Sequence, residues 1–193
     1  MRVLDGEDPV AITTAATALR AGRLVVMPTE TVYGLAANAL DPAAVARIFE
    51  AKGRPADNPV IVHVADAEAA HKLTGEWPEG AHQLARRFWP GPLTLVLPRG
   101  PDVPPIISGG LPTVAVRVPV HPVARALLEE VGLPLAAPSA NVSGRPSPTR
   151  VEHAVADLGV KVSVYLDGGP CEVGVESTIV GWAEGHPLVF REG

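Results

Sequence analysis

A short apolar run that ends in a proline and a polar loop constrains the fold more than any other stretch. Residues 24–27 (LVVM) are apolar and predict a buried strand. Pro28 ends this strand, because proline has no backbone N–H to donate to a sheet. The oxygen-bearing residues 29–31 (TET) follow, before the apolar run 35–40. Such a loop at the end of a buried strand is a common ligand site in α/β proteins, although a turn whose hydroxyl groups bind their own backbone also fits.

The remaining pattern predicts helices and strands that alternate irregularly, as in a mixed α/β fold. The first two helices are expected to begin at the Asp-Pro pairs 8–9 and 41–42 and to end at Gly22 and Gly53. A later helix is expected to be capped by Thr149 and to end near residue 158. Other helices are expected at 66–73, 80–88 and 122–132, strands at 60–64, 93–97, 113–119, 133–137, 162–166, 176–180 and 188–191, and a surface loop at 99–112.

Composition excludes several classes of protein and site. The formal net charge of −5 over 193 residues argues against a broad basic surface for nucleic acid. The single cysteine, Cys171, excludes an internal disulfide and a CxxC pair, which fits a reducing, cytoplasmic setting. No stretch of about 20 apolar residues predicts a membrane span. The sequence lacks P-loop, dinucleotide-binding and HExxH motifs, and its histidines show no helical pairing that would indicate a zinc site.

The strand at 113–119 (TVAVRVP) separates two kinds of side chain. Its valines point to one face, whereas Thr113, Ala115 and Arg117 point to the other. An arginine among small residues indicates a hollow face where a guanidinium group can bind a carboxylate or phosphate. An arginine on the wet face of an antiparallel sheet fits this pattern equally well.

Other polar positions have both functional and ordinary interpretations. Lys52 and Arg54 flank the end of a helix, where positive charge also complements the helix dipole. His63 shares a strand face with Ile61, and a lone strand histidine is more often a core or edge residue than a ligand. The loop 138–149 concentrates hydroxyl, amide and guanidinium groups, which suit either a polar anionic ligand or a solvated linker.

Taken in order, these segments resemble the YrdC-like family, the threonylcarbamoyl-AMP synthases. The matching blocks are 28–35 (PTETVYGL), 52–55 (KGRP), 58–59 (NP), 89–94 (WPGPLT), 117–119 (RVP), 139–144 (SANVSG), 147–149 (SPT), 177–180 (STIV) and 191–193 (REG). Each block alone is weak, but the ordered set covers essentially the whole chain and is specific. Gly181 departs from the pattern, since an acidic residue is expected there.

The resemblance implies a three-layer α/β fold of the YrdC/RibB-like kind, with a twisted mixed sheet around a large cavity. It further implies a single catalytic domain over residues 1–193, the short form of the family. The implied activity is that of an L-threonylcarbamoyladenylate synthase, which converts L-threonine, bicarbonate or CO₂, and ATP into threonylcarbamoyl-AMP and pyrophosphate. A partner complex would then transfer the threonylcarbamoyl group to tRNA, next to the anticodon.

The resemblance also assigns roles to individual residues. The implied catalytic set is Lys52, Arg54, Ser139 and Asn141; ATP would also contact Asn58, Thr113, Ser147 and Arg191, and threonine would contact Thr31, His63, Arg117, Ala137 and Ser177. A Mg²⁺ ion is expected with ATP and would be held mainly by the phosphates, without a protein-built metal site. Two alternatives are an RNA-binding paralogue without this activity and a related carbamoyl-transfer enzyme on the same fold.

Overall fold

A ten-stranded mixed sheet runs through the protein, in a computed structural model that describes residues 1–55 and 57–193. The strands are β1 (Arg2–Asp5), β2 (Val25–Met27), β3 (Gly34–Asn38), β4 (Ile61–His63), β5 (Leu93–Pro98), β6 (Thr113–Arg117), β7 (Leu135–Ala136), β8 (Val164–Asp167), β9 (Thr178–Ala183) and β10 (His186–Arg191). Their order in the sheet is β1-β8-β2-β3-β7-β4-β6-β5-β9-β10. Parallel pairs such as β4–β6 adjoin antiparallel pairs such as β5–β6, which confirms the expected mixed α/β class.

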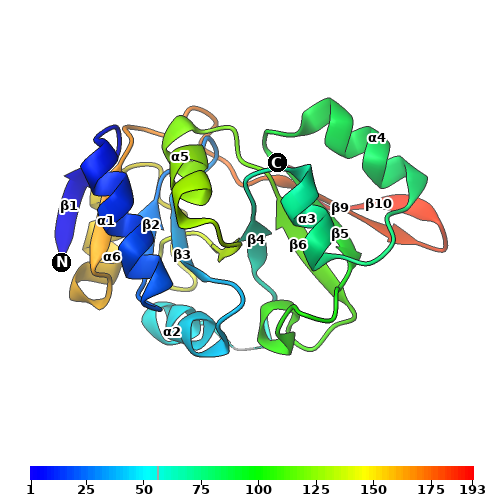
Figure 1. The fold of residues 1–193 in the computed structure, drawn as a ribbon, viewed down its shortest axis with the longest axis horizontal. Coiled ribbons are helices and arrows are strands. Elements are labelled where there is room, and N and C mark those ends of the chain that lie inside the picture. Colours follow the sequence, from blue (N-terminus) through cyan, green and yellow to red (C-terminus); the bar gives the residue numbers. More distant parts are fainter. Residues whose placement is uncertain (56) are drawn as a thin grey trace.

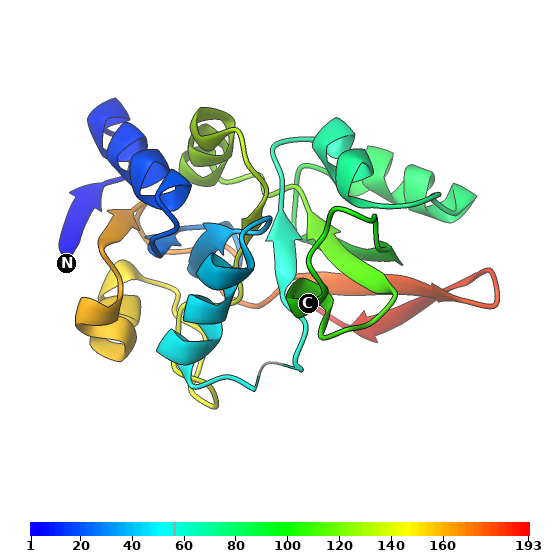
Figure 2. The same ribbon diagram turned by 60° about the horizontal axis from the view of Figure 1, so that its bottom comes forward.

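Helices cover both faces of this sheet. They are α1 (Pro9–Arg20), α2 (Pro42–Lys52), α3 (Ala67–Leu73), α4 (Glu79–Phe88), α5 (Pro122–Val131) and α6 (Val151–Leu158), with short 3₁₀ turns η1 (Pro105–Ser108) and η2 (Gly159–Lys161). Helices α1 and α5 pack together on one face of the N-terminal half of the sheet, and α2 and α6 lie on the other (Figures 1 and 2). None of the helices in the described residues is long and apolar enough to cross a membrane.

The first two helices begin where the sequence predicts. The side chains of Asp8 and Asp41 accept hydrogen bonds from Val10 N and Ala43 N, and a proline follows each cap. Helix α2 ends at Gly53, whose φ of 60° lies in the left-handed region that favours glycine. Because α2 ends at this glycine, Lys52 is the last residue of the helix and Arg54 lies just after it, at the start of the connection to β4.

Three expectations from the sequence need correction. Thr149 does not cap α6, because its carbonyl accepts a hydrogen bond from Cys171 N and the cap position is Arg150, without a side-chain cap bond. The loop 99–112 contains the 3₁₀ turn η1. Strand β1 was not expected, since it is a largely exposed edge strand of four residues with little apolar pattern.

The C-terminal half of the sheet is covered on only one face. Side chains of α3 and α4 share a core cluster with the buried valines of β6. The opposite face of β6 presents Thr113, Ala115 and Arg117 to a cavity, and β4 adds Ile61 and His63 on the same side. This confirms the hollow face that the alternation in residues 113–119 predicts.

Candidate functional site

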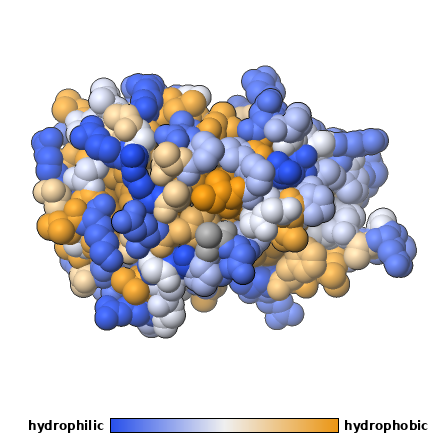
Figure 3. Space-filling view, turned by 90° about the horizontal axis from the view of Figure 1, so that it is seen from below, coloured by the Kyte–Doolittle hydropathy of each residue, from blue (hydrophilic) through white to orange (hydrophobic). Residues whose placement is uncertain are grey.

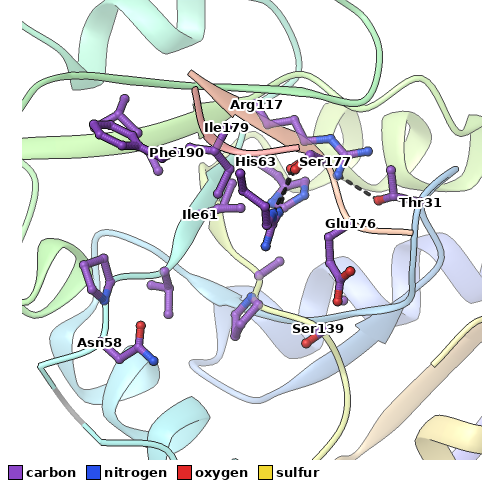
Figure 4. Close-up of a pocket in the computed structure, with 18 of the residues that line it drawn as sticks. Thr31, Asn58, Ile61, His63, Arg117, Ser139, Glu176, Ser177, Ile179 and Phe190 are labelled. Atoms are coloured by element: carbon purple, nitrogen blue, oxygen red, sulfur yellow. Dashed lines mark hydrogen bonds between the residues drawn. The ribbon is translucent and has the colours of Figure 1, made fainter. Parts of the chain in front are cut away.

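A cavity of about 510 Å³ lies against the uncovered face of β4, β5 and β6 (Figure 4). Strands β9 and β10, the loop after β2 and the loop after β7 supply other parts of its wall. Ten of the thirteen site residues expected from the sequence line it: Thr31, Arg54, Asn58, His63, Thr113, Arg117, Ala137, Ser139, Ser177 and Arg191. The fold thus brings together residues from six distant blocks of the sequence.

The loop after β2 is both a turn held by its own hydroxyl groups and a part of the cavity wall, which are the two interpretations that the sequence allows. Thr29 Oγ1 donates to Val32 O at 2.6 Å and accepts from Val32 N at 3.2 Å, so this hydroxyl holds the turn. Thr31 Oγ1 instead accepts from Arg117 Nη1 at 2.9 Å and lies on the cavity wall. Tyr33 is fully buried, and its hydroxyl donates to Gly169 O at 2.6 Å. Thr29 and Tyr33 therefore make the loop rigid, while Thr31 faces the cavity.

A buried ion pair fixes the arginine of β6. Arg117 Nη2 donates to Glu30 Oε1 at 2.5 Å, and both side chains are about 95% buried, with exposed fractions of 4% and 5%. Arg117 Nε also donates to Gly91 O, and Glu30 Oε2 accepts from Val120 N. Glu30 has no role that the sequence indicates, because nothing local in the sequence connects it to an arginine 87 positions away.

Arg191, the last residue of β10, is held by hydrogen bonds to Ser177. Arg191 donates from Nε to Ser177 O at 3.0 Å and from Nη2 to Ser177 Oγ at 3.1 Å. The Ser177 hydroxyl is buried and lies 2.7 Å from Thr94 Oγ1. This chain of hydrogen bonds orients a guanidinium group on the cavity wall without cancelling its charge.

His63 is a neutral group on the cavity wall. Burial, with a smaller contribution from the guanidinium of Arg117, lowers the pKa of His63 to about 3. In the described residues its Nδ1 has no hydrogen-bond partner. A buried imidazole with a free ring nitrogen can exchange a hydrogen bond with a small polar ligand.

Three expected site residues do not line the cavity. The ammonium group of Lys52 is buried and donates to Ser139 O and Asn141 O, both at 2.5 Å, so in this conformation it anchors the loop after β7. Burial lowers the pKa of Lys52 to about 8. The amide of Asn141 donates to Val142 O and Arg145 O. Ser147 donates to Glu176 Oε1 at 2.5 Å.

Other cavity residues had no assigned role in the sequence analysis. They are Thr29, Val32, Gly34, Pro59, Val60, Ile61, Val96, Leu111, Ala115, Pro138, Glu176, Ile179, Trp182 and Phe190.

The Phe190 ring explains the unusual glycine of β9, since a Cβ at Gly181 would lie 2.3 Å from Phe190 Cε2. Leu188, Val189 and Phe190 are exposed on β10, and apolar surface gathers at the lower right of the view from below (Figure 3).

The charges on the cavity wall are mainly positive. Arg54 donates from Nη2 to Pro59 O at 2.8 Å, and Arg117 and Arg191 complete a set of three guanidinium groups. Glu176 is the one carboxylate among the described residues that line the cavity. No group of three His, Cys, Asp or Glu side chains in residues 1–55 and 57–193 is placed to hold a metal ion. The wall therefore suits a ligand that carries several negative charges.

Comparisons with known proteins identify the family. The family model Sua5_yciO_yrdC, described as "Telomere recombination", matches residues 17–193, so the chain belongs to this family. The chain is 56% identical over 182 residues to the threonylcarbamoyl-AMP synthase of Pyrococcus abyssi and 53% identical over 191 residues to that of Bacillus subtilis. These alignments cover 94% and 98% of this chain but only 54% and 55% of the relatives, so the chain spans about half of their length.

Solved structures agree with this assignment. The crystal structure of P. abyssi Sua5 complexed with L-threonine superposes with a TM-score of 0.96 and 52% identity, over 99% of this chain and 57% of that chain. The crystal structure of Escherichia coli YciO superposes with a TM-score of 0.87 and 26% identity, over 99% of this chain and 93% of that chain. The fold expected from the resemblance is confirmed.

Proposed function

We propose that this member of the Sua5/YciO/YrdC family makes threonylcarbamoyl-AMP from L-threonine, bicarbonate or CO₂, and ATP, with release of pyrophosphate. The observation that carries the proposal is that one cavity gathers three guanidinium groups, from Arg54, Arg117 and Arg191, beside a neutral histidine. The names of the P. abyssi and B. subtilis relatives and the L-threonine complex of P. abyssi Sua5 support it.

L-Threonine would bind at the end of the cavity formed by the loop after β2, β4 and β6. Arg117 would bind its carboxylate, since a guanidinium group suits a carboxylate and Glu30 already fixes its orientation. Thr31 and the neutral ring of His63 would form hydrogen bonds with the amino acid's hydroxyl and amine groups. The Ala137 backbone and the Ser177 hydroxyl would complete this end.

ATP would bind along the wall formed by Arg54, Asn58, Ser139 and Arg191. Thr113 lies on the same wall, and Lys52, Asn141 and Ser147 would act through the loop that they hold or after a change in their present hydrogen bonds. A Mg²⁺ ion would accompany ATP and neutralise part of the phosphate charge. The site suits an ion held mostly by phosphate oxygens and water, because its described residues offer one carboxylate and no cage of protein ligands.

The reaction needs positioning and charge neutralisation more than a protein nucleophile. The neutral amine of threonine would attack bicarbonate or CO₂ and form a carbamate, with loss of water or a proton. A carbamate oxygen would then attack the α-phosphorus, and the bond to pyrophosphate would break. Arg54 and Arg191 would stabilise the developing charge on the leaving group, and burial raises the pKa of Cys171 to about 11, which disfavours a thiolate nucleophile.

The product is a mixed anhydride, which is suited to transfer its acyl group to an amine. We therefore place this protein before a tRNA-modifying partner complex that accepts the threonylcarbamoyl group. Neither the RNA-binding nor the carbamoyl-transfer alternative is favoured by a specific feature of the cavity.

The test is to incubate the purified protein with ATP, L-threonine and bicarbonate and to follow pyrophosphate and the adenylate by mass spectrometry. We expect Arg54→Ala to lower the rate about 10²–10³-fold, because a charged donor to the phosphates is lost. Cys171→Ser is the control and should retain activity. Failure to form a threonine-dependent product, or loss of activity in Cys171→Ser with retention in Arg54→Ala, would reject the proposal.

A further inference from the structure

Glu176 holds an unusual position on the wall of this cavity. It is the only carboxylate among the described lining residues, and it is directed into the cavity on the side of Ser139 (Figure 4). Its Oε1 accepts from Ser147 Oγ at 2.5 Å, whereas no other described residue donates to Oε2. The carboxylate is therefore fixed by one oxygen and has the other available to a ligand.

Glu176 lies where the two proposed ends of the cavity meet: Ser177 of the threonine end follows it in the chain, and its hydrogen-bond partner and a nearby guanidinium group belong to the wall proposed for ATP. Ser147 and Ser139 come from the loop after β7, and Arg191 lies close enough to influence the carboxyl group. The hydrogen bond from Ser147, with smaller contributions from the residue's own backbone N–H and from Arg191, lowers the pKa of Glu176 below its usual value, although partial burial opposes the shift. The side chain is consequently an anion at neutral pH, next to the expected position of a triphosphate.

A carboxylate beside a triphosphate is disfavoured by like-charge repulsion, which Arg191 offsets in part and a cation between the two anions would offset further. A hydrated Mg²⁺ ion usually takes one or two protein carboxylates together with substrate phosphates, and Glu176 supplies that kind of ligand. The ammonium group of threonine is the other candidate cation. It fits less well, because the amine must lose its proton to form a carbamate and because the carboxylate points toward Ser139, on the wall proposed for ATP (Figure 4).

We infer that Glu176 binds the Mg²⁺ ion of the ATP complex through Oε2, directly or through one water molecule, while Ser147 orients it through Oε1. The inference rests on the proposed function, because it requires ATP in this cavity. Glu176 is then a specific determinant of metal-dependent nucleotide binding. This role adds one protein ligand to a metal that the sequence led us to assign mainly to the phosphates.

The test compares wild-type protein with Glu176→Gln, which keeps the shape and an acceptor for Ser147 but removes the charge. ATP binding is measured by calorimetry in the presence of L-threonine, with and without Mg²⁺, and Mn²⁺ binding to the ATP complex is measured by electron paramagnetic resonance. We expect Glu176→Gln to weaken Mn²⁺ binding about 10–100-fold. Without a metal, the variant should bind ATP more tightly than wild type, because the repulsion between anions is gone.

Two further variants make the result specific. Glu172→Gln removes a carboxylate from an exposed position in the same segment, outside the cavity, and should leave both measurements unchanged. Glu176→Asp retains the charge and should recover part of the metal affinity, and it serves as the comparison if the glutamine variant does not fold.

The possible outcomes separate this inference from the proposed function. Unchanged Mn²⁺ affinity and unchanged Mg²⁺ dependence in Glu176→Gln would overturn the inference alone, provided that the wild type forms the adenylate. Weakened threonine binding with normal metal binding would assign the carboxylate to the ammonium group instead and would also overturn it. Absence of ATP binding by wild type would reject the proposed function and this inference together.

Discussion

The ion pair between Glu30 and Arg117 should be one of the most sensitive points of the structure. Glu30→Gln removes one charge and leaves the guanidinium group in an environment where the side chains are only 4% and 5% exposed. Breaking a buried pair in this way costs about 3–5 kcal/mol, because the remaining charge is neither paired nor hydrated. That is a large part of the roughly 5–15 kcal/mol that stabilises a typical folded protein.

Urea unfolding followed by circular dichroism and by tryptophan fluorescence is a suitable assay. With a slope of about 1–3 kcal/mol per M, the expected loss lowers the midpoint by at least about 1 M. The matched control is Lys72→Gln, which breaks a pair between Lys72 and Glu68 at 3.0 Å whose side chains are 71% and 80% exposed. Such a surface pair within one helix contributes only about 0.3–0.5 kcal/mol.

A double variant completes the test. Glu30→Gln combined with Arg117→Met removes both charges, and it should lose less stability than the sum of the two single changes. The reasoning is refuted if Glu30→Gln unfolds at the same urea concentration as Lys72→Gln. It is also refuted if the single changes are additive, because additivity would mean that the two charges do not stabilise one another.

Two other predictions concern stability. Burial lowers the pKa of His63 to about 3 in the folded protein, below the ordinary value of 6.5 in the unfolded chain. As the pH falls from about 6.5 to 3, the unfolded chain binds a proton that the folded protein does not, so the free energy of unfolding decreases. Between pH 6.5 and 5, wild type should lose about 2 kcal/mol more than His63→Gln in urea unfolding, and parallel pH profiles would contradict this. Gly109→Ala should destabilise more than Gly132→Ala by about 1–3 kcal/mol. Both glycines have positive φ, but a Cβ at Gly109 would lie 2.3 Å from Asp57 O, whereas one at Gly132 has nothing within 4 Å; equal thermal midpoints would contradict the difference.

Patterns within one element could be interpreted correctly from the sequence. The alternation of valines with Thr113, Ala115 and Arg117 predicts both faces of β6, because side chains of a strand alternate with a period of two. The Asp-Pro pairs predict the starts of α1 and α2 for an equally local reason. Interactions confined to a few neighbouring residues leave a signal in the sequence itself.

Interactions between distant segments left no such signal. Lys52 was expected to contact phosphates, yet its partners in the structure are backbone carbonyls 87 and 89 positions away, which any residue type can supply. Glu30 and Glu176 were not assigned roles, because a carboxylate in a loop gives no indication of the strand or hydroxyl that it will meet. The family resemblance located most of the cavity wall, but only the three-dimensional arrangement connects these acidic residues to it.

The structure also gives the three arginines of the cavity different electrostatic roles. Arg117 is paired with Glu30, so the pair is neutral overall and suits a ligand with a single negative charge, such as an amino-acid carboxylate. Among the described residues, Arg54 and Arg191 are not within ion-pair distance of a carboxylate and are held by carbonyl and hydroxyl groups. Neither charge is cancelled by an ion pair with a described residue, although Glu176 lies close enough to Arg191 to interact with it, so both suit a polyphosphate. In the proposed arrangement, charge at the amino-acid end is balanced before any ligand binds, whereas two guanidinium groups against the single carboxylate of Glu176 leave the nucleotide end positive, and this difference would orient ATP and threonine in one direction along the cavity.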